Sequence, residues 1–284
     1  MGSSGIIRVG WWWGAALSVV FCTGAAPLAA QDRPSPSASA CRFPIFATGQ
    51  ATRVIDGRSF MLSDGREVRL AAIEVPPAPE PGDSRHAAAA GTAAKAALES
   101  ILSGESVELR WPASAPALDR YGRILAYVEI AGSGRAVIYE MLASGYARVS
   151  AHVGNMACAA ELFSRERVAR RAKLGLWADP GYVVLSAGNG AELLAERGRF
   201  TVVEGKVFSV RESGGTIYVN FGRRWAEALT VTILKRHERI FSGAGVGLKR
   251  LENRVVRVRG WVDERNGPRI EATRPEQIEI AELN

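Results

Sequence analysis

Apolar and polar residues alternate from Ala47 to Val75, in "ATGQATRVIDGRSFMLSDGREVRLAAIEV". Such alternation is typical of strands that bury one face and expose the other. Within it, the triplet "SDG" at Ser63 to Gly65 favours a tight turn between the apolar runs 60–62 and 68–70. The stretch therefore predicts three strands, of which the last two form a hairpin.

Helices and two more strands are predicted from the sequence that follows. The Ala-rich segment "SRHAAAAGTAAKAALESILSG" places Leu98, Ile101 and Leu102 on one helix face, and Gly104 caps its end. Strand patterns come next in "ESVELRW" and "ILAYVEI". The segments "RAVIYEMLASG" and "NMACAAELFSRERVARRAK" then read as helices. The expected order is three strands, a helix, two strands and two helices.

A second strand-rich block follows a weakly patterned connector at residues 181–198. Its strand patterns are "RFTVVEGKVFSVRE", "GTIYVNFG", "EALTVTIL", "RVVRVRGWVDE" and "RIEATRPEQIEI", with a mixed helical segment after the third. Three strands, a helix and two strands is the element order of an OB-type barrel. The sequence thus predicts a mainly β chain with helices (α+β). An OB-fold barrel with three helices spans residues 43–180, and an OB-like five-stranded barrel spans residues 199–284.

The first thirty residues have the pattern of an export signal. Arg8 precedes an apolar run, and small residues ending in "PLAA" follow it. Residues 1–30 are therefore expected to be a signal peptide, and residues 31–42 a flexible linker. The protein is expected to be exported, periplasmic or secreted, and membrane-tethered if the signal is not cleaved. No transmembrane span is expected in the mature chain.

Export leaves two cysteines in the mature chain, because Cys22 would be removed with the signal. Two thiols in an oxidising compartment usually pair, so a Cys41–Cys158 disulfide is expected. A formal charge of +7 favours polyanionic partners, although many exported proteins are simply basic. The predicted helix contains the basic run "SRERVARRAK" at residues 164–173, which is either a nucleic-acid contact or a solvated helix face. Four aromatic residues of the second block are either stacking platforms for bases or parts of the barrel core. These aromatic residues are Tyr218, Phe221, Trp225 and Trp261.

Three motifs stand in order along the first block: "DGRS" at 56–59, "RLAAIEVP" at 69–76 and "DRYGR" at 119–123. Together they resemble the thermonuclease family, which is staphylococcal-nuclease-like, with its usual "DGDT", "RL.GIDAPE" and "D.YGR". The resemblance covers about residues 43–180. It implies a Ca²⁺-dependent phosphodiesterase site on an OB barrel, with nucleic acid as the partner. In the family, two arginines grip the phosphate, a glutamate activates water and aspartates hold Ca²⁺.

The resemblance assigns roles to several residues here. Arg69 and Arg123 match the phosphate-binding arginines, with Tyr121 beside the second. Asp56 matches a metal-binding aspartate, and Glu74 stands at a second ligand position. Other readings remain open: Arg69 as a surface ion-pair partner, Arg123 as a turn residue packed on Tyr121, and Asp56 as a turn former.

Two positions depart from the family pattern. Arg58 stands where the main metal-binding aspartate is expected, and Pro77 stands where the catalytic glutamate is expected. A guanidinium at the metal position repels Ca²⁺, pairs with Glu74 or contacts a phosphate as a substrate-binding residue. Glu80 or Asp83, in the Pro-rich loop, is a candidate replacement base. The three histidines, His86, His152 and His237, have no partners at metal-ligand spacing.

Three functions are compatible with these residues. The departures favour a weak or inactive phosphodiesterase that binds nucleic acid or another phosphate-bearing ligand. The alternatives are an active metal-dependent endonuclease with a remodelled base, and an envelope protein-interaction module that uses its C-terminal block. Glu80 or Asp83 within reach of a cleft formed by Arg69 and Arg123 would favour the endonuclease. Exposed apolar patches on the C-terminal block would favour the interaction module.

Overall fold

A computed structural model describes residues 1–2, 10, 39–78, 85–112, 117–154 and 156–281. The chain divides into two units, Met1–Ser37 and Ala38–Asn284, and both barrels lie in the second. Most of the expected signal peptide and of the expected linker falls outside the described residues. So do Glu80 and Asp83 of the Pro-rich loop.

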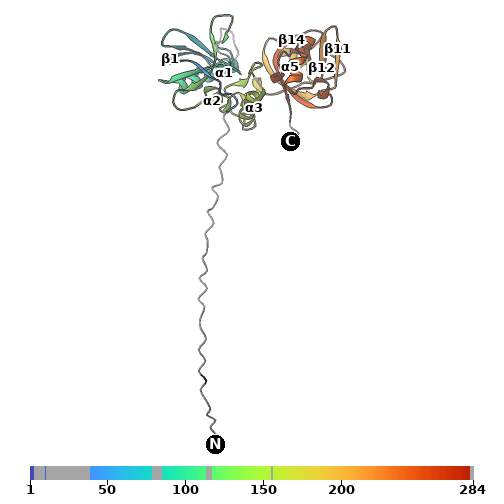
Figure 1. The fold of residues 1–284 in the computed structure, drawn as a ribbon. Helices are drawn as coiled ribbons and strands as arrows, with labels where there is room; N and C mark the ends of the chain where they lie inside the picture. The colour runs from blue at the N-terminus through green and yellow to red at the C-terminus, as the bar shows by residue number, and fades with distance from the viewer. Residues whose placement is uncertain (3–9, 11–38, 79–84, 113–116, 155, 282–284) are drawn as a thin grey trace. The chain divides into compact units, whose positions relative to one another are not determined.

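The first barrel is built from the six strands that the structure describes between residues 45 and 130, drawn in blue to green in Figure 1. Its sheet has the order β3-β2-β1-β5-β7, with β6 on β7, and a parallel pairing of β3 with β7 closes it. This is the expected OB-type barrel. Its strands are β1 (Ile45–Asp56), β2 (Ser59–Leu62), β3 (Glu67–Leu70), β5 (Ser106–Arg110), β6 (Ala117–Leu118) and β7 (Ile124–Ile130).

The expected hairpin joins β2 to β3. Gly65 adopts a φ of 86°, which an L side chain rarely tolerates, and its N–H donates to the Leu62 carbonyl. The Asp64 carboxylate accepts from the Arg66 N–H at 3.0 Å and fixes the turn. The hairpin sets the register in which Ser59 lies opposite Arg69.

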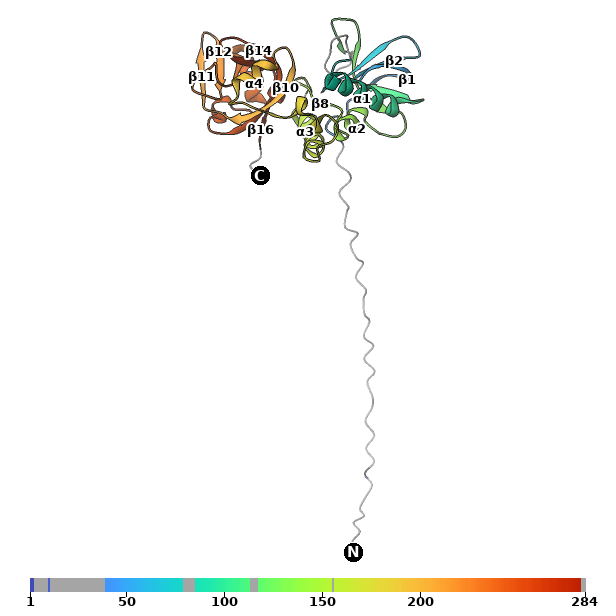
Figure 2. The ribbon, with the colours of Figure 1, turned by 180° about the vertical axis from the view of Figure 1, so that it is seen from behind.

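Three helices accompany the first barrel: α1 (Arg85–Leu102), α2 (Val137–Ala143) and α3 (Met156–Arg171). Figure 2 shows α1 with strands β1 and β2 from the reverse side. A side chain at Gly57 would place its Cβ 2.8 Å from the Ala94 Cβ of α1, so the turn after β1 needs glycine there. A short pair, β4 (Ile73–Glu74) and β8 (Arg148–Val149), connects the barrel to the helical segment.

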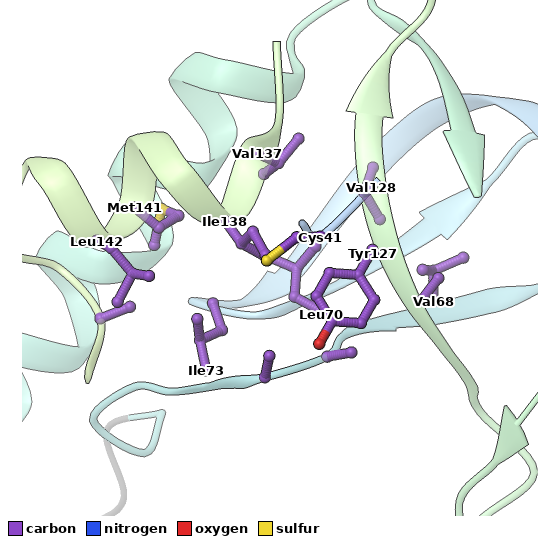
Figure 3. Packing of buried hydrophobic residues seen from close by; sticks show 14 of the residues in the cluster. Cys41, Val68, Leu70, Ile73, Tyr127, Val128, Val137, Ile138, Met141 and Leu142 are labelled. Carbon is purple, nitrogen blue, oxygen red and sulfur yellow. The ribbon is translucent and has the colours of Figure 1, made fainter. Parts of the chain in front are cut away.

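The core of the first barrel lies between its strands and α2. Val68, Leu70 and Tyr127 face Ile138 of α2, with Cys41 among them (Figure 3). The expected disulfide between Cys41 and Cys158 is confirmed, and it closes a loop of 117 residues.

The second barrel repeats the topology of the first. Strand β11 continues from β10 after a break at residues 207–208, and the sheet runs β11-β12-β13-β15-β14-β10 with β13 and β15 parallel. The expected last strand is interrupted by a 3-10 turn, η5 (Pro275–Gln277), before β16 (Ile278–Ile280). The strands of the barrel are β10 (Phe200–Lys206), β11 (Ser209–Ser213), β12 (Thr216–Asn220), β13 (Thr230–Leu234), β14 (Val255–Glu264) and β15 (Pro268–Glu271).

The segments outside the barrel strands contain more regular structure than their patterns indicate. The connector at 181–198 includes a strand that pairs with β10 and a short helix. Gly145 and Gly175 approach so closely that a Cβ on Gly145 would lie 2.2 Å from the Leu174 carbonyl oxygen. These elements are η1 (Gly175–Ala178), η2 (Pro180–Tyr182), β9 (Leu185–Ser186), α4 (Gly190–Ala195), η3 (Lys235–His237), α5 (Glu238–Gly243) and η4 (Leu248–Leu251).

Each barrel has its own hydrophobic core, and a buried ion network joins them. Arg259 of β14 and Glu166 of α3 are both fully buried, with 3.0 Å between the Arg259 Nη1 and the Glu166 Oε2. Arg259 also donates to the Val149 carbonyl at 3.0 Å. No helix among the described residues is long and apolar enough to cross a membrane.

Candidate functional site

The turn after β1 brings Arg58 to β4. The Asp56 carboxylate accepts from the Arg58 N–H at 2.8 Å, which shapes the turn. The Arg58 Nη1 lies 2.6 Å from the Glu74 Oε2 and donates to the Ile73 carbonyl at 3.0 Å. Both side chains of this pair are mostly buried, at 16% and 17% exposure. The pairing of Arg58 with Glu74 that the sequence suggested is present.

Arg69 points to the same turn from β3. Its Nη1 donates to the Ser59 hydroxyl at 3.1 Å and lies 3.9 Å from the Asp56 Oδ2. The antiparallel pairing of β2 with β3 places Ser59 directly opposite Arg69, which explains the contact. Asp56, Arg58, Arg69 and Glu74 therefore form one cluster of two guanidiniums and two carboxylates.

This cluster does not fit the Ca²⁺ ion that the family resemblance implies. Ca²⁺ takes six to eight oxygen ligands, several from carboxylates. Here Glu74 faces the Arg58 guanidinium, and Asp56 is shared between the Arg58 backbone and Arg69. Within the described part of the chain, no group of three or more His, Cys, Asp and Glu side chains is placed to hold a metal ion.

Arg123 is held in a separate ion cluster at the start of β7. Its Nε donates to the Asp119 Oδ2 at 2.7 Å, and its Nη1 lies 3.7 Å from the Glu67 Oε1. Tyr121 is 66% exposed, and the Arg123 guanidinium lies 5.1 Å from its ring centroid. Burial raises the pKa of Asp119, but hydrogen bonds from Arg123 and the backbone outweigh burial and leave that pKa below its ordinary value.

A cleft of about 750 Å³ opens over the Arg58 cluster and continues to the second barrel. Its volume lies within the range of ligand-binding sites, roughly 300–1,000 Å³. Among the described residues that line it, Arg123 is absent. The cleft is lined by Asp56, Arg58, Arg69, Glu74, Val75, Pro76, Pro77, Ala78, Arg148, Asp179, Gly181, Tyr182, Gly198, Arg199, Phe200 and Trp261.

Pro77 lies on the wall of this cleft, where the family has its general base. Proline has no proton acceptor on its side chain, so this wall offers no base at that position. Glu80 and Asp83, the candidate replacements, lie outside the described residues.

Most of the residues that complete the cleft were not identified from the sequence. These are Arg148 of β8, Tyr182 of η2, and Arg199 and Phe200 of the second barrel. Trp261 of β14, one of the four aromatic candidates, also lines the cleft. The pairing of β4 with β8 places Arg148 opposite Glu74. The sequence carried one available signal, the arginine in "GYARVS", but only the arrangement of the two barrels makes it a cleft residue.

A second cavity of about 600 Å³ shares Arg58, Arg69 and Glu74 with the cleft. His152 lines it, and burial together with Arg274 lowers the pKa of that histidine. Arg274 and Glu276, from the end of the second barrel, complete the wall.

The aromatic candidates of the second block and the basic helix differ in their burial. Phe221 is buried in the second core, whereas Trp225 and Trp261 are more than half exposed. Tyr218 and Trp225 lie nearly parallel, with ring centroids 6.2 Å apart, beside a cavity of about 300 Å³. The basic helix α3 is not only a solvated face, because Glu166 within it is fully buried.

Part of this chain is similar in sequence to one protein family. Residues 67–179 match the family described as Staphylococcal nuclease homologue. The chain is also 34% identical over 97 residues to an uncharacterized protein of Methanocaldococcus jannaschii, which covers 34% of this chain and 46% of that protein. The chain thus spans less than half the length of that relative. Residues 67–179 thus carry a staphylococcal-nuclease-like domain.

Proposed function

We propose that this protein binds a nucleic-acid strand through the backbone phosphate groups of that nucleic acid. We further propose that it hydrolyses phosphodiester bonds weakly or not at all. The nuclease-like domain supports nucleic acid as the ligand. Arg58 and Arg69 supply permanent positive charge on the wall of a cleft of ligand-binding size. A planar guanidinium can donate two parallel N–H···O bonds to two oxygens of one phosphate group.

The Arg58–Glu74 ion pair carries this proposal. It places a guanidinium at 2.6 Å from the carboxylate that the family pattern assigns to the metal. A divalent cation at this position would meet the repulsion of Arg58 and would lose one of its expected ligands. Loss of the general base at Pro77 costs a further factor of about 10²–10⁴ in rate.

The test measures binding of a labelled single-stranded oligonucleotide by fluorescence anisotropy at several salt concentrations. We expect Arg69→Gln to weaken binding and to reduce its salt dependence, because one phosphate contact is lost. Arg53→Gln is the matched control, since Arg53 is exposed on β1 and lines a different pocket. Equal affinity of the wild type and Arg69→Gln would contradict the proposal.

An active endonuclease is the second candidate, because the cleft wall reaches Ala78, two residues before Glu80. In that case Ca²⁺-dependent cleavage would be found in the wild type and lost in Glu80→Gln. A third candidate, an envelope protein-interaction module, would show no nucleic-acid binding and would capture a protein partner through the second barrel.

Export is part of the proposal. The Cys41–Cys158 disulfide supports it, because structural disulfides persist mainly in oxidising compartments. Cell fractionation of the full chain tests this, and recovery with cytoplasmic markers alone would refute it.

A further inference from the structure

Arg148 is a buried cation whose charge no described carboxylate neutralises directly. Arg148 is 5% exposed. Its guanidinium lies against the rings of Tyr182 and Phe200, 5.2 Å from each ring centroid. Among the described residues, no ion pair or side-chain hydrogen bond forms on this guanidinium, and its buried Nε has no acceptor. A buried charge without a partner is costly.

The two nearest carboxylates are already engaged. Glu74 is bonded to Arg58 at 2.6 Å. Glu166 accepts from Arg259 at 3.0 Å and from the Val149 N–H at 2.6 Å. Neither carboxylate is available to Arg148 without the loss of another buried contact. Burial lowers the pKa of Arg148 to about 10, against the attraction of Glu166.

The environment of Arg148 is open on the side of the cleft, where it is part of the lining. Arg199 lies near it, with its guanidinium 5.7 Å from the Tyr182 ring centroid. Arg199 pairs with Glu196 at 2.9 Å, and the two side chains are 44% and 20% exposed. An anion held by Arg148 would compete with this partly exposed pair for the Arg199 guanidinium.

The carboxylates of the cleft do not cancel this charge. Asp56 lies against Arg69, and Glu74 against Arg58, in the first barrel. Asp179 accepts from the Gly181 N–H at 2.8 Å, in the cap of η2. Among the described arginines that line the cleft, Arg148 is the one for which no ion pair with a described carboxylate is found, and its guanidinium lies 5.2 Å from each of the two ring centroids.

We propose that Arg148, with Arg199, forms a phosphate-binding site at the junction of the two barrels, which takes a second phosphate of the strand held at Arg58 and Arg69. The statement that this phosphate belongs to a nucleic-acid strand rests on the proposed function. The statement that Arg148 binds a phosphate does not. Trp261 is 55% exposed on the same cleft and packs edge-on against Phe200. Its free face is available to stack a base beside this phosphate.

Arg148→Met tests the site, because methionine keeps much of the side-chain volume and removes the charge. We expect the affinity for a single-stranded oligonucleotide to fall by roughly 10- to 100-fold, as for the loss of a charge-assisted hydrogen bond. The thermal midpoint without ligand should stay unchanged or rise, because an unpaired buried charge is removed. Arg53→Met is the control, with unchanged affinity.

Inorganic phosphate provides a second readout that does not involve a strand. It should raise the unfolding midpoint of the wild type relative to chloride at equal ionic strength, and this rise should be absent in Arg148→Met. If Arg148→Met fails to fold, the test uses the phosphate-induced rise in the unfolding midpoint of the wild type. A smaller rise in the variant Arg199→Gln would support the site, and an equal rise would overturn it.

The outcomes separate this site from the proposed function. Weaker oligonucleotide binding in Arg69→Gln but not in Arg148→Met would overturn the site and leave the function standing. A phosphate shift that requires Arg148, without oligonucleotide binding by the wild type, would establish the site and reject the function. No response to phosphate and no effect of Arg148→Met on oligonucleotide affinity would overturn the site.

Discussion

Glu166→Gln should destabilise the protein strongly, because it removes one charge from a fully buried pair. Glu166 and Arg259 have no solvent exposure, and after the substitution Arg259 would keep its charge with Glu279, at 3.2 Å, as its remaining carboxylate partner. Breaking a buried pair from one side typically costs about 3–5 kcal/mol. The glutamine amide would also present N–H donors to the Arg259 donors, while the Val149 N–H competes for its one acceptor oxygen.

The magnitude can be measured by thermal and urea unfolding of the full chain. For a protein of this size, 3–5 kcal/mol corresponds to a fall in midpoint of roughly 6–20 °C. The matched control is Glu227→Gln, since Glu227 pairs with Arg224 at 2.7 Å on the surface with 63% and 77% exposure. That control should leave the midpoint unchanged.

The double variant Glu166→Leu/Arg259→Met isolates the reason for the loss. Replacing both charges by apolar side chains should recover part of the stability, because the buried Arg259 charge is removed. Glu279 keeps its pairs with Arg167 and Arg257, whereas Arg170 loses its pair with Glu166. A Glu166→Gln midpoint equal to that of the wild type would refute the reasoning. So would a double variant less stable than Glu166→Gln, because the damage would then lie in packing and not in charge.

Three further predictions concern the first barrel. The double variant Cys41→Ser/Cys158→Ser should lose about 4–5 kcal/mol in urea unfolding, since it opens a loop of 117 residues; a loss below 1 kcal/mol would contradict this. Because the pKa of Asp119 is lowered on folding, its contribution to stability is complete above about pH 4 and is lost as the pH falls through the lowered pKa. Asp119→Asn should therefore be less stable than the wild type at pH 6, and its free energy of unfolding should fall less steeply as the pH is lowered. Parallel curves of the free energy of unfolding against pH would refute this. Arg58→Asp replaces the blocking guanidinium by a carboxylate, so calorimetry should detect Ca²⁺ binding that Arg58→Gln lacks; equal Ca²⁺ affinity of the two variants would reject the account of Arg58.

The barrel topology was largely predictable because strands and turns are encoded locally. The alternation around "SDG" predicts the hairpin of β2 and β3, and the element order of each block predicts an OB-type barrel. The break of the first strand of the second barrel at residues 207–208 was not predicted, since both halves carry the same alternation. The short elements inside the connector depend on pairing with β10 and have no strong local signal.

The site was predictable where motifs lie close in sequence and unpredictable where the two barrels meet. Asp56, Arg58 and Glu74 come from one turn and one neighbouring strand, so their cluster follows from the motif. In the sequence, Arg259 has the pattern of a half-buried strand residue, and Arg148 follows a predicted helix and belongs to no motif. Their burial results from contacts between distant segments, which periodicity does not report.

The central claim is that the cleft holds a nucleic-acid strand without cutting it efficiently. The most direct measurement is a single-turnover time course, in which excess protein is incubated with an end-labelled strand in Ca²⁺ and in chelator. Anisotropy of the same sample reports binding. We expect a bound strand that stays intact in both conditions over the time in which an active thermonuclease would cut it. Rapid Ca²⁺-dependent cleavage, or an unbound strand at low salt, would show that the cleft does not hold a strand in this way.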